Sequence, residues 1–306
     1  MDYPHRNENR AVAFGLRWSS ALPLRQFQCL EFEGPPDVAV TIAAPPVPAR
    51  TELARWGTGA VCSDGYRFSA DAEAIIDIFG ADRIAVTPGE NWTGEMPPHF
   101  FGTATAVILA SRGLIPLHGT AVEIAGCAVL LCGRSGGGKS TIGAKLIALG
   151  GKLISDDLTA LVMDPDGLPY VLAGRPGMRL HPDTAKALSA SLDCGTPVPA
   201  LNGKLLVFPR RIASFERRLL AGVVMLDRDD AVLPLKLQIL LLRSQIFRPR
   251  LMHLVPNAME RSKVTAEVAR KIGVARMREL RVYDERTCLA LAQQIFARCE
   301  SPAHPA

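Results

Sequence analysis

LLCGRSGGGKST, residues 130–141, is the most informative stretch of this 306-residue chain. It matches the pattern G-x-x-x-x-G-K-[ST] in full, from Gly133 to Ser140, and an apolar run precedes it. Residues without a Cβ atom let the backbone wind around a phosphate group, and the helix that follows offers its positive N-terminal end. The stretch therefore predicts a phosphate-binding loop between a strand and a helix.

The residue types of this loop predict how it binds a nucleotide. Lys139 is expected to reach the β- and γ-phosphates, and the hydroxyl of Ser140 is expected to bind Mg²⁺. ATP and Mg²⁺ are therefore the predicted cofactors, although GTP fits the same motif. The residues expected to bind the nucleotide are Gly133, Ser135, Gly136, Gly137, Gly138, Lys139, Ser140 and Thr141.

Two adjacent carboxylates follow the loop at a short distance along the chain. Residues 139–149 predict a helix, and residues 152–155, KLIS, predict a strand that leads into Asp156 and Asp157. A right-handed crossover lays this strand parallel to the strand before the loop, which brings both carboxylates beside the phosphates. One carboxylate can then hold Mg²⁺ while the other faces an acceptor hydroxyl, in an order that the residues alone leave open. The alternative is a turn cap followed by a surface residue.

Other polar residues near the motif are ambiguous by themselves. Asp227 ends an apolar run, but Arg228 follows where an ATPase often places a glutamate, so we interpret Asp227 as a strand-end turn residue. His118 in PLHGT has a spacing that favours a structural role. Arg175 and Arg179, in GRPGMRL, fit either the neutralisation of phosphate charge or ordinary salt bridges.

Composition excludes several classes of protein. The chain is 48% hydrophobic and has a net charge of +5, which indicates a globular protein and argues against nucleic acid as a partner. It contains no run of about 18 uncharged apolar residues, and residues 1–10 lack the apolar core of a signal peptide, so we expect no membrane partner. The seven cysteines are scattered without C-x-x-C, which favours a reduced, cytoplasmic protein.

The chain divides into two predicted domains. Residues 1–100 consist of short strand-like runs and turns, with a hairpin expected at residues 63–65 and a helix over residues 71–80. Residues 101–306 alternate strands and helices, start with a helix that ends at Gly113, and finish in a helical C-terminal segment. The predicted fold class is α/β, with a P-loop nucleotide-binding domain preceded by a small β-rich domain.

The segment LHGTAVEIAGCAVLLCGRSGGGKSTIGAKLIALGGKLISDDLTAL, residues 117–161, closely resembles the catalytic domain of the HPr kinase/phosphorylase family, the bacterial serine kinases with a P-loop. Its order of loop, helix and paired aspartates is also similar to that of phosphoenolpyruvate carboxykinase. The resemblance implies a nucleotide domain of this type. By matching positions it implies that His118 lies near the acidic pair, that Asp156 is the base, and that Asp157 binds the metal. Together with Lys139, His118 and Asp156 form the implied catalytic set.

The layout from VAFGLRWSSALPLRQF to SRGLIPLHG resembles shorter HPr-kinase-like proteins of peptide-maturation systems. In lasso-peptide systems such proteins phosphorylate the C-terminal serine of a precursor peptide. The resemblance thus implies an ATP- and Mg²⁺-dependent serine kinase acting on a peptide or small protein, and a homo-oligomer. GRPGMRL departs from the family's Gly- and Glu-containing loop, which argues against HPr as substrate and against the reverse phosphorolysis. Two rival hypotheses are a nucleotide-sensing module without catalysis and a simple ATPase.

Overall fold

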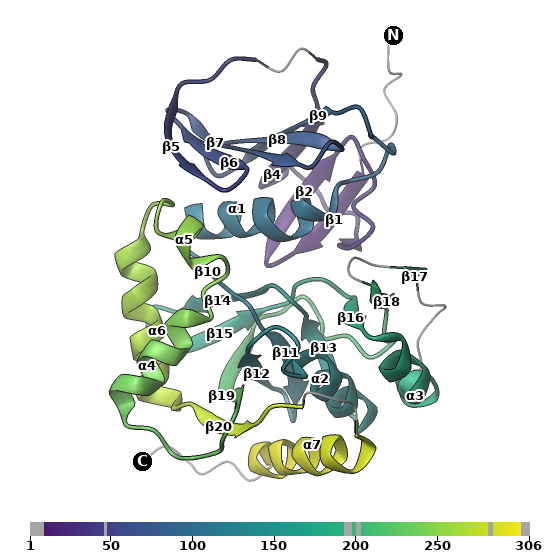
Figure 1. Cartoon of the computed structure of the whole chain (residues 1–306), viewed down its shortest axis with the longest axis vertical. Helices are drawn as coiled ribbons and strands as arrows, with labels where there is room; N and C mark the ends of the chain where they lie inside the picture. The colour runs from purple at the N-terminus through teal and green to yellow at the C-terminus, as the bar shows by residue number, and fades with distance from the viewer. Residues whose placement is uncertain (1–8, 46–47, 193–197, 200–202, 281–283, 301–306) are drawn as a thin grey trace. The chain divides into compact units, whose positions relative to one another are not determined.

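The computed structural model describes residues 9–45, 48–192, 198–199, 203–280 and 284–300. The protein is a mixed α/β structure with two large mixed sheets, one in each of two compact units (Figure 1). The first unit comprises Met1–Leu114 and Arg248–Ala258, and the second comprises Ile115–Phe247 and Met259–Ala306. Among the described residues, no helix is long and apolar enough to cross a membrane.

The first unit is built on a nine-stranded sheet of order β3-β1-β2-β4-β9-β8-β7-β6-β5. Its strands are β1 (Asn9–Ala13), β2 (Leu16–Ser20), β3 (Gln28–Cys29), β4 (Val38–Ile42), β5 (Glu52–Trp56), β6 (Gly59–Cys62), β7 (Gly65–Ala70), β8 (Ala74–Phe79) and β9 (Arg83–Pro88). The expected β-rich character of this region is confirmed. The hairpin expected at residues 63–65 is also confirmed, because Cys62 pairs with Gly65 across the turn between β6 and β7.

The helix expected over residues 71–80 is wrong, because β8 occupies most of this stretch and pairs antiparallel with β7 and β9. Ala74, Ile76 and Ile78 are buried at every second position, which is the period of a strand. Asp77 is buried on the other face only because the guanidinium groups of two arginines bind it. The β-branched residues here favour the sheet once neighbouring strands are present.

The first unit also contains short helices: η1 (Phe100–Ala104), a π-helix, α1 (Thr105–Ser111) and α5 (Pro249–Met252). The helix predicted to end at Gly113 is confirmed by α1. Gly113 has a positive φ of 82°, as is common just after the end of a helix.

The division between the units falls elsewhere than the boundary expected at residue 100. Residues 101–114 and 248–258 both belong to the first unit. The ring of Phe101 packs edge-on against that of Phe27, with centroids 5.4 Å apart. Residues 248–258, far along the sequence, complete this unit, and no change in local composition marks their start.

The second unit is built on an eight-stranded sheet of order β10-β14-β15-β19-β12-β11-β13, with β20 paired to β19. Its strands are β10 (Ile115–Leu117), β11 (Thr120–Ile124), β12 (Cys127–Gly133), β13 (Lys152–Ser155), β14 (Thr159–Met163), β15 (Pro169–Leu172), β19 (Arg218–Asp227) and β20 (Ala275–Arg278). A smaller sheet holds β16 (Met178–Leu180), β18 (Leu205–Val207) and β17 (Val198–Pro199). The helices are α2 (Lys139–Ala148), α3 (Pro182–Leu192), α4 (Leu235–Ser244), α6 (Ala258–Ile272) and α7 (Glu285–Glu300).

The relation between β12 and β13 positions the site. β13 pairs antiparallel with β11, and β11 pairs antiparallel with β12, so β12 and β13 run in the same direction. The expected parallel orientation is confirmed, but the two strands are not neighbours because β11 lies between them. The C-terminal ends of β12 and β13 still lie at one edge of the sheet. This edge carries both the glycine-rich loop, residues 133–140, and the paired aspartates.

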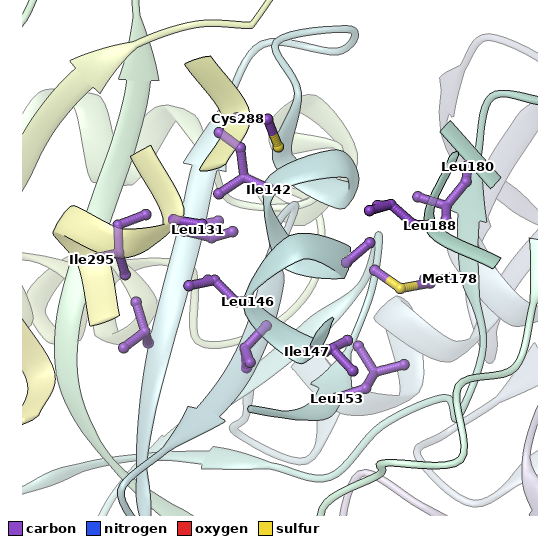
Figure 2. Packing of buried hydrophobic residues seen from close by; sticks show 14 of the residues in the cluster. Leu131, Ile142, Leu146, Ile147, Leu153, Met178, Leu180, Leu188, Cys288 and Ile295 are labelled. Atoms are coloured by element: carbon purple, nitrogen blue, oxygen red, sulfur yellow. The ribbon is translucent and has the colours of Figure 1, made fainter. Parts of the chain in front are cut away.

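The helix after the loop rests on a tightly packed core (Figure 2). Ile142 and Leu146 of α2 are fully buried and belong to one cluster with Leu131 of β12 and side chains of α3 and α7. A Cβ atom on Gly143 would lie 2.6 Å from Cγ2 of Thr120, so only glycine lets α2 approach β11 this closely. The loop is therefore held between a rigid strand and a rigid helix.

Candidate functional site

The glycine-rich loop requires glycine at particular positions. Gly133, Gly136 and Gly138 all have φ between 80° and 137°, a region that other residues rarely adopt. A Cβ atom on Gly138 would lie 2.8 Å from Cβ of Leu280, and one on Gly133 would lie 2.5 Å from the carbonyl oxygen of Leu226. The first and last glycines of the motif are thus required both by backbone conformation and by close neighbours.

Lys139 begins α2 and turns its side chain back into the loop. Its Nζ atom donates hydrogen bonds to the carbonyl oxygens of Gly133 and Arg134, at 2.9 and 3.0 Å. The side chain is buried, and burial lowers the pKa of Lys139, an effect that the nearby carboxylates of Asp156 and Asp157 offset only in part. The ammonium group therefore lies inside the loop that the motif predicts will hold phosphate.

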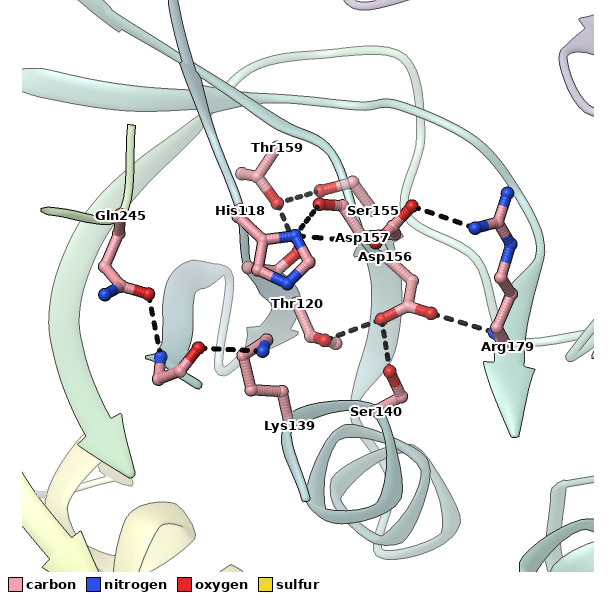
Figure 3. Close-up of polar contacts among 12 residues, drawn as sticks. His118, Thr120, Lys139, Ser140, Ser155, Asp156, Asp157, Thr159, Arg179 and Gln245 are labelled. Atoms are coloured by element: carbon pink, nitrogen blue, oxygen red, sulfur yellow. Dashed lines mark hydrogen bonds and ion pairs between the residues drawn. The ribbon is translucent and has the colours of Figure 1, made fainter. Parts of the chain in front are cut away.

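Asp156 follows β13 and lies directly beside the loop (Figure 3). Its Oδ1 atom accepts hydrogen bonds from the hydroxyls of Thr120, at 2.6 Å, and Ser140, at 2.9 Å. Its Oδ2 atom accepts a hydrogen bond from the backbone N–H of Arg179 at 2.9 Å. The residue is only 1% exposed. The expected meeting of the first aspartate with the hydroxyl of the motif is thus present in the structure.

Asp157 has different partners from its neighbour, as Figure 3 shows. Its Oδ2 atom lies 3.3 Å from Nη2 of Arg175 and 3.2 Å from Nη1 of Arg179. Burial alone would raise the pKa of Asp157, but the two guanidinium groups outweigh this effect and hold the pKa below its usual value. Both arginines are salt-bridged, one of the two alternatives that their sequence context left open. Asp157 is therefore ionised at neutral pH, and its side chain remains 26% exposed.

His118 lies beside Asp157. Its Nδ1 atom is 3.1 Å from the backbone carbonyl oxygen of Asp157 and 3.5 Å from Oδ1 of the same residue. A carbonyl oxygen only accepts, so this contact requires the proton on Nδ1 and leaves Nε2 without one. Burial and then the charge of Lys139 lower the pKa of His118, so the imidazole is neutral at pH 7. The expected proximity of His118 to the acidic pair is confirmed by these distances.

Gln245 connects His118 and the loop, and sequence reasoning missed it. Its Oε1 atom accepts a hydrogen bond from the N–H of Gly133 at 3.0 Å, and its carbonyl oxygen accepts one from the N–H of His118 at 2.7 Å. The residue follows α4, more than a hundred positions after the loop. No motif surrounds it, so no sequence signal could have identified it. Thr120, by contrast, is the last residue of PLHGT, two positions after His118, so the motif itself could have suggested it.

A cleft of about 480 Å³ joins these groups. It is lined by Ser135, Gly136, Gly138, Lys139, Ser140 and Thr141 of the loop and α2, by His118, Asp156 and Asp157, and by Arg179, His181, Pro182, Asp183, Thr184, Lys204 and Leu280. All the predicted site residues therefore border one cleft except Gly133 and Gly137. The N–H of Gly137 is bonded to the carbonyl oxygen of Arg134.

Asp227 ends β19, the strand that runs parallel beside β12, but its carboxylate is engaged elsewhere. Its Oδ2 atom lies 3.0 Å from Nη2 of Arg276, and its Oδ1 atom accepts the backbone N–H of Arg228 at 2.7 Å. It does not line the cleft described above. These contacts agree with its interpretation as a strand-end residue.

Comparison with known proteins gives a partial structural likeness only. No protein-family model matches the sequence, and no curated protein matches it. The HPr(Ser) kinase/phosphatase from Coxiella burnetii is similar over part of its structure, with 17% sequence identity and a TM-score of 0.26. The match covers 37% of this chain and 59% of that chain, so this chain spans less than two thirds of the kinase it matches. The chemistry of the site therefore rests on its own residues.

Proposed function

We propose that the protein is an ATP- and Mg²⁺-dependent kinase that transfers the γ-phosphoryl group to a serine hydroxyl of a peptide or small protein. The observation that carries this proposal is the 2.9 Å hydrogen bond between the hydroxyl of Ser140 and the carboxylate of Asp156. In P-loop phosphotransferases a loop serine or threonine and a strand-end aspartate together hold the magnesium ion. Ser140, at the start of α2, and Asp156, directly after β13, have this relation.

The donor set fits magnesium. Mg²⁺ binds hard oxygen ligands, keeps several water molecules, and needs only one or two carboxylates when phosphates supply further oxygens. Within the described ranges of the chain, no group of three or more His, Cys, Asp or Glu side chains is arranged to hold a metal by itself. A shared site formed by Asp156, Ser140 and the nucleotide therefore fits better than an all-protein cage. The ion would neutralise charge on the phosphates.

The contacts favour an exchange of the roles that the family resemblance implies for the two carboxylates. Asp156 is buried against Ser140, which suits the metal side of the site. Asp157 is partly exposed in the cleft and touches His118, which suits the acceptor side. Its lowered pKa makes it a weak base, and a weak base suffices where bond formation to the acceptor lags behind loss of the leaving group.

The proposed reaction depends mainly on positioning and electrostatics. Lys139 and the N–H groups of the loop hold the phosphates, while Arg175 and Arg179 orient the carboxylate of Asp157. The serine oxygen attacks the γ-phosphorus, the bond to the β–γ bridging oxygen breaks, and the hydroxyl proton passes to Asp157. The C-terminal serine of a lasso precursor peptide is the first acceptor that we propose to test.

The test uses intact mass spectrometry of a serine-ended precursor peptide after incubation with the protein, ATP and Mg²⁺. We expect the peptide to gain the mass of one phosphoryl group. Asp157→Asn should lower the transfer rate by about 10² or more while Mg²⁺-dependent nucleotide binding persists, as expected when a general base is lost. Asp156→Asn should instead raise the Mg²⁺ concentration needed for half-maximal nucleotide binding. Asp166→Asn, in an exposed turn after β14, is the matched control.

Two outcomes contradict the proposal. Release of inorganic phosphate at the same rate with and without peptide indicates a simple ATPase. Tight nucleotide binding without transfer or hydrolysis indicates a nucleotide-sensing module. An effect of Asp156→Asn on transfer alone, with unchanged Mg²⁺ dependence, would restore the role that the family resemblance implies for it.

A further inference from the structure

The smaller sheet of the second unit presents one of its faces to the cleft. Arg179 of β16 pairs directly with Leu206 of β18, and directly opposed residues of an antiparallel pair point to the same face. Lys204 comes directly before β18, two residues before Leu206, and side chains alternate along an extended chain, so this spacing favours the same face for Lys204. Arg179 and Lys204 both line the cleft, in agreement with this register.

The opposite face of the same sheet is committed to the core. Met178, Leu180 and Val207 are at most 1% exposed and belong to the cluster around α2. Figure 2 shows Met178 and Leu180 in this packing, near Leu188 of α3. The core residues therefore fix which way the sheet faces, and Lys204, directly before β18, lines the cleft on the other side.

Lys204 differs from the other cations of the cleft in its contacts. Arg179 is engaged with Asp157, and Lys139 is bonded to loop carbonyls. The ammonium group of Lys204 has no hydrogen-bond or ion-pair partner within the part of the chain that the structure describes. Burial lowers the pKa of Lys139, and the charge of Lys204 lowers it as well, which indicates that the two ammonium groups lie near each other. Lys204 is half-buried as a residue, and its unpaired ammonium group can bind an anion that enters the cleft.

We propose that Lys204 binds the terminal phosphate of a nucleoside triphosphate in this cleft, as a second lysine beside Lys139. The inference rests on the proposed function and deepens it. Three carboxylates, those of Asp156, Asp157 and Asp183, line the same cleft. A bound triphosphate would therefore face three negative charges, and the motif supplies one lysine, Lys139, to offset them. Lys204 supplies the additional positive charge that the transferred group needs when charge spreads over its oxygens. Its ammonium group has no acceptor atom, so it takes part only as a hydrogen-bond donor.

The test compares nucleotides that differ by the terminal phosphate, so it needs no acceptor. Dissociation constants are measured by calorimetry with Mg²⁺ for β,γ-imido-ATP and ADP, and for the corresponding guanosine nucleotides. Lys204→Ala should weaken binding of the triphosphate analogue at least about tenfold, the loss expected for one charge-assisted contact, and change diphosphate binding by less than about twofold. Lys204→Arg should recover part of the triphosphate affinity. Lys186→Ala, exposed on α3, is the control and should leave both constants unchanged.

The outcomes separate this inference from the proposed function. A Lys204→Ala variant with wild-type thermal unfolding tests the role of Lys204 by itself. If it weakens triphosphate and diphosphate binding equally, or changes neither, the role of Lys204 is overturned and the proposed function is not. If Lys204→Ala unfolds early, Lys204→Gln takes its place under the same criteria. A wild-type protein that binds none of the four nucleotides would overturn the proposed function, and this inference with it.

Discussion

Thr120→Val removes one buried hydrogen bond to Asp156 and changes little else, because valine has nearly the shape of threonine. Thr120 is fully buried, and its hydroxyl lies 2.6 Å from Oδ1 of Asp156. A hydrogen bond to a charged group contributes about 1.5–3 kcal/mol. Asp156 keeps its bonds to Ser140 and the N–H of Arg179, so the carboxylate is not left without partners. We therefore expect the local free energy of unfolding to fall by about 2 kcal/mol, within this range.

The assay must report on the second unit. Trp18, Trp56 and Trp92 all belong to the first unit, so tryptophan fluorescence would follow the wrong part of the chain. Native-state hydrogen exchange of peptides from β11 and β13, read by mass spectrometry over a urea series, gives the local free energy directly. A loss of about 2 kcal/mol appears there as a roughly thirtyfold faster exchange.

Two further variants decide whether the hydroxyl is responsible. Thr120→Ser keeps the hydroxyl and loses only the methyl contact near Gly143, which should cost about 1 kcal/mol. The double mutant with Asp156→Asn should show a favourable coupling of at least about 0.5 kcal/mol, because the two groups touch. If Thr120→Val exchanges at the wild-type rate, or if the two mutations are additive, the hydrogen bond does not hold Asp156 in place and the reasoning is refuted.

Three other predictions follow from the same contacts. Gly138→Ala should lower stability by about 1–3 kcal/mol, because the new Cβ atom meets Leu280 at 2.8 Å and the backbone has φ of 91°; a wild-type Tm would contradict this. The lowered pKa of Asp157 contributes stability that is complete above about pH 4, its ordinary range, and is lost as the pH falls through the lower folded-state pKa. Asp157→Asn should therefore flatten the acid side of the plot of Tm against pH. An unchanged plot would show that the ionised carboxylate of Asp157 does not contribute to stability. Gln245→Ala should speed hydrogen exchange at the Gly133 amide and weaken nucleotide binding, whereas Gln245→Glu, which keeps an acceptor, should speed this exchange less.

The local elements around the glycine-rich loop of the second unit could be predicted because local rules agree there. The apolar run of β12, the glycines of the loop and the helix formers of α2 all favour one strand–loop–helix unit. The helix predicted over residues 71–80 was wrong because the apolar pattern there fits both a helix and a strand. Pairing with β7 and β9 decided for the strand.

The members of the site could be predicted only where they lie inside a motif. Lys139, Ser140, Asp156 and Asp157 are close in sequence, so spacing and the direction of two strands suffice to bring them together. Their individual partners could not be predicted, because the bonds of each carboxylate depend on side chains from other strands. The proximity of His118 was implied by family resemblance and not by its spacing.

The sequence by itself determined that a glycine-rich loop with a lysine and a hydroxyl joins a strand to a helix, since backbone conformation at Gly133 and Gly138 is a local property. Only the tertiary structure decided that Gln245 bonds the loop and that Lys204 faces the cleft. Both residues reach the site through strand register and helix packing over long sequence separations. Contacts of this kind are selected by the burial of the whole core, which no local pattern encodes.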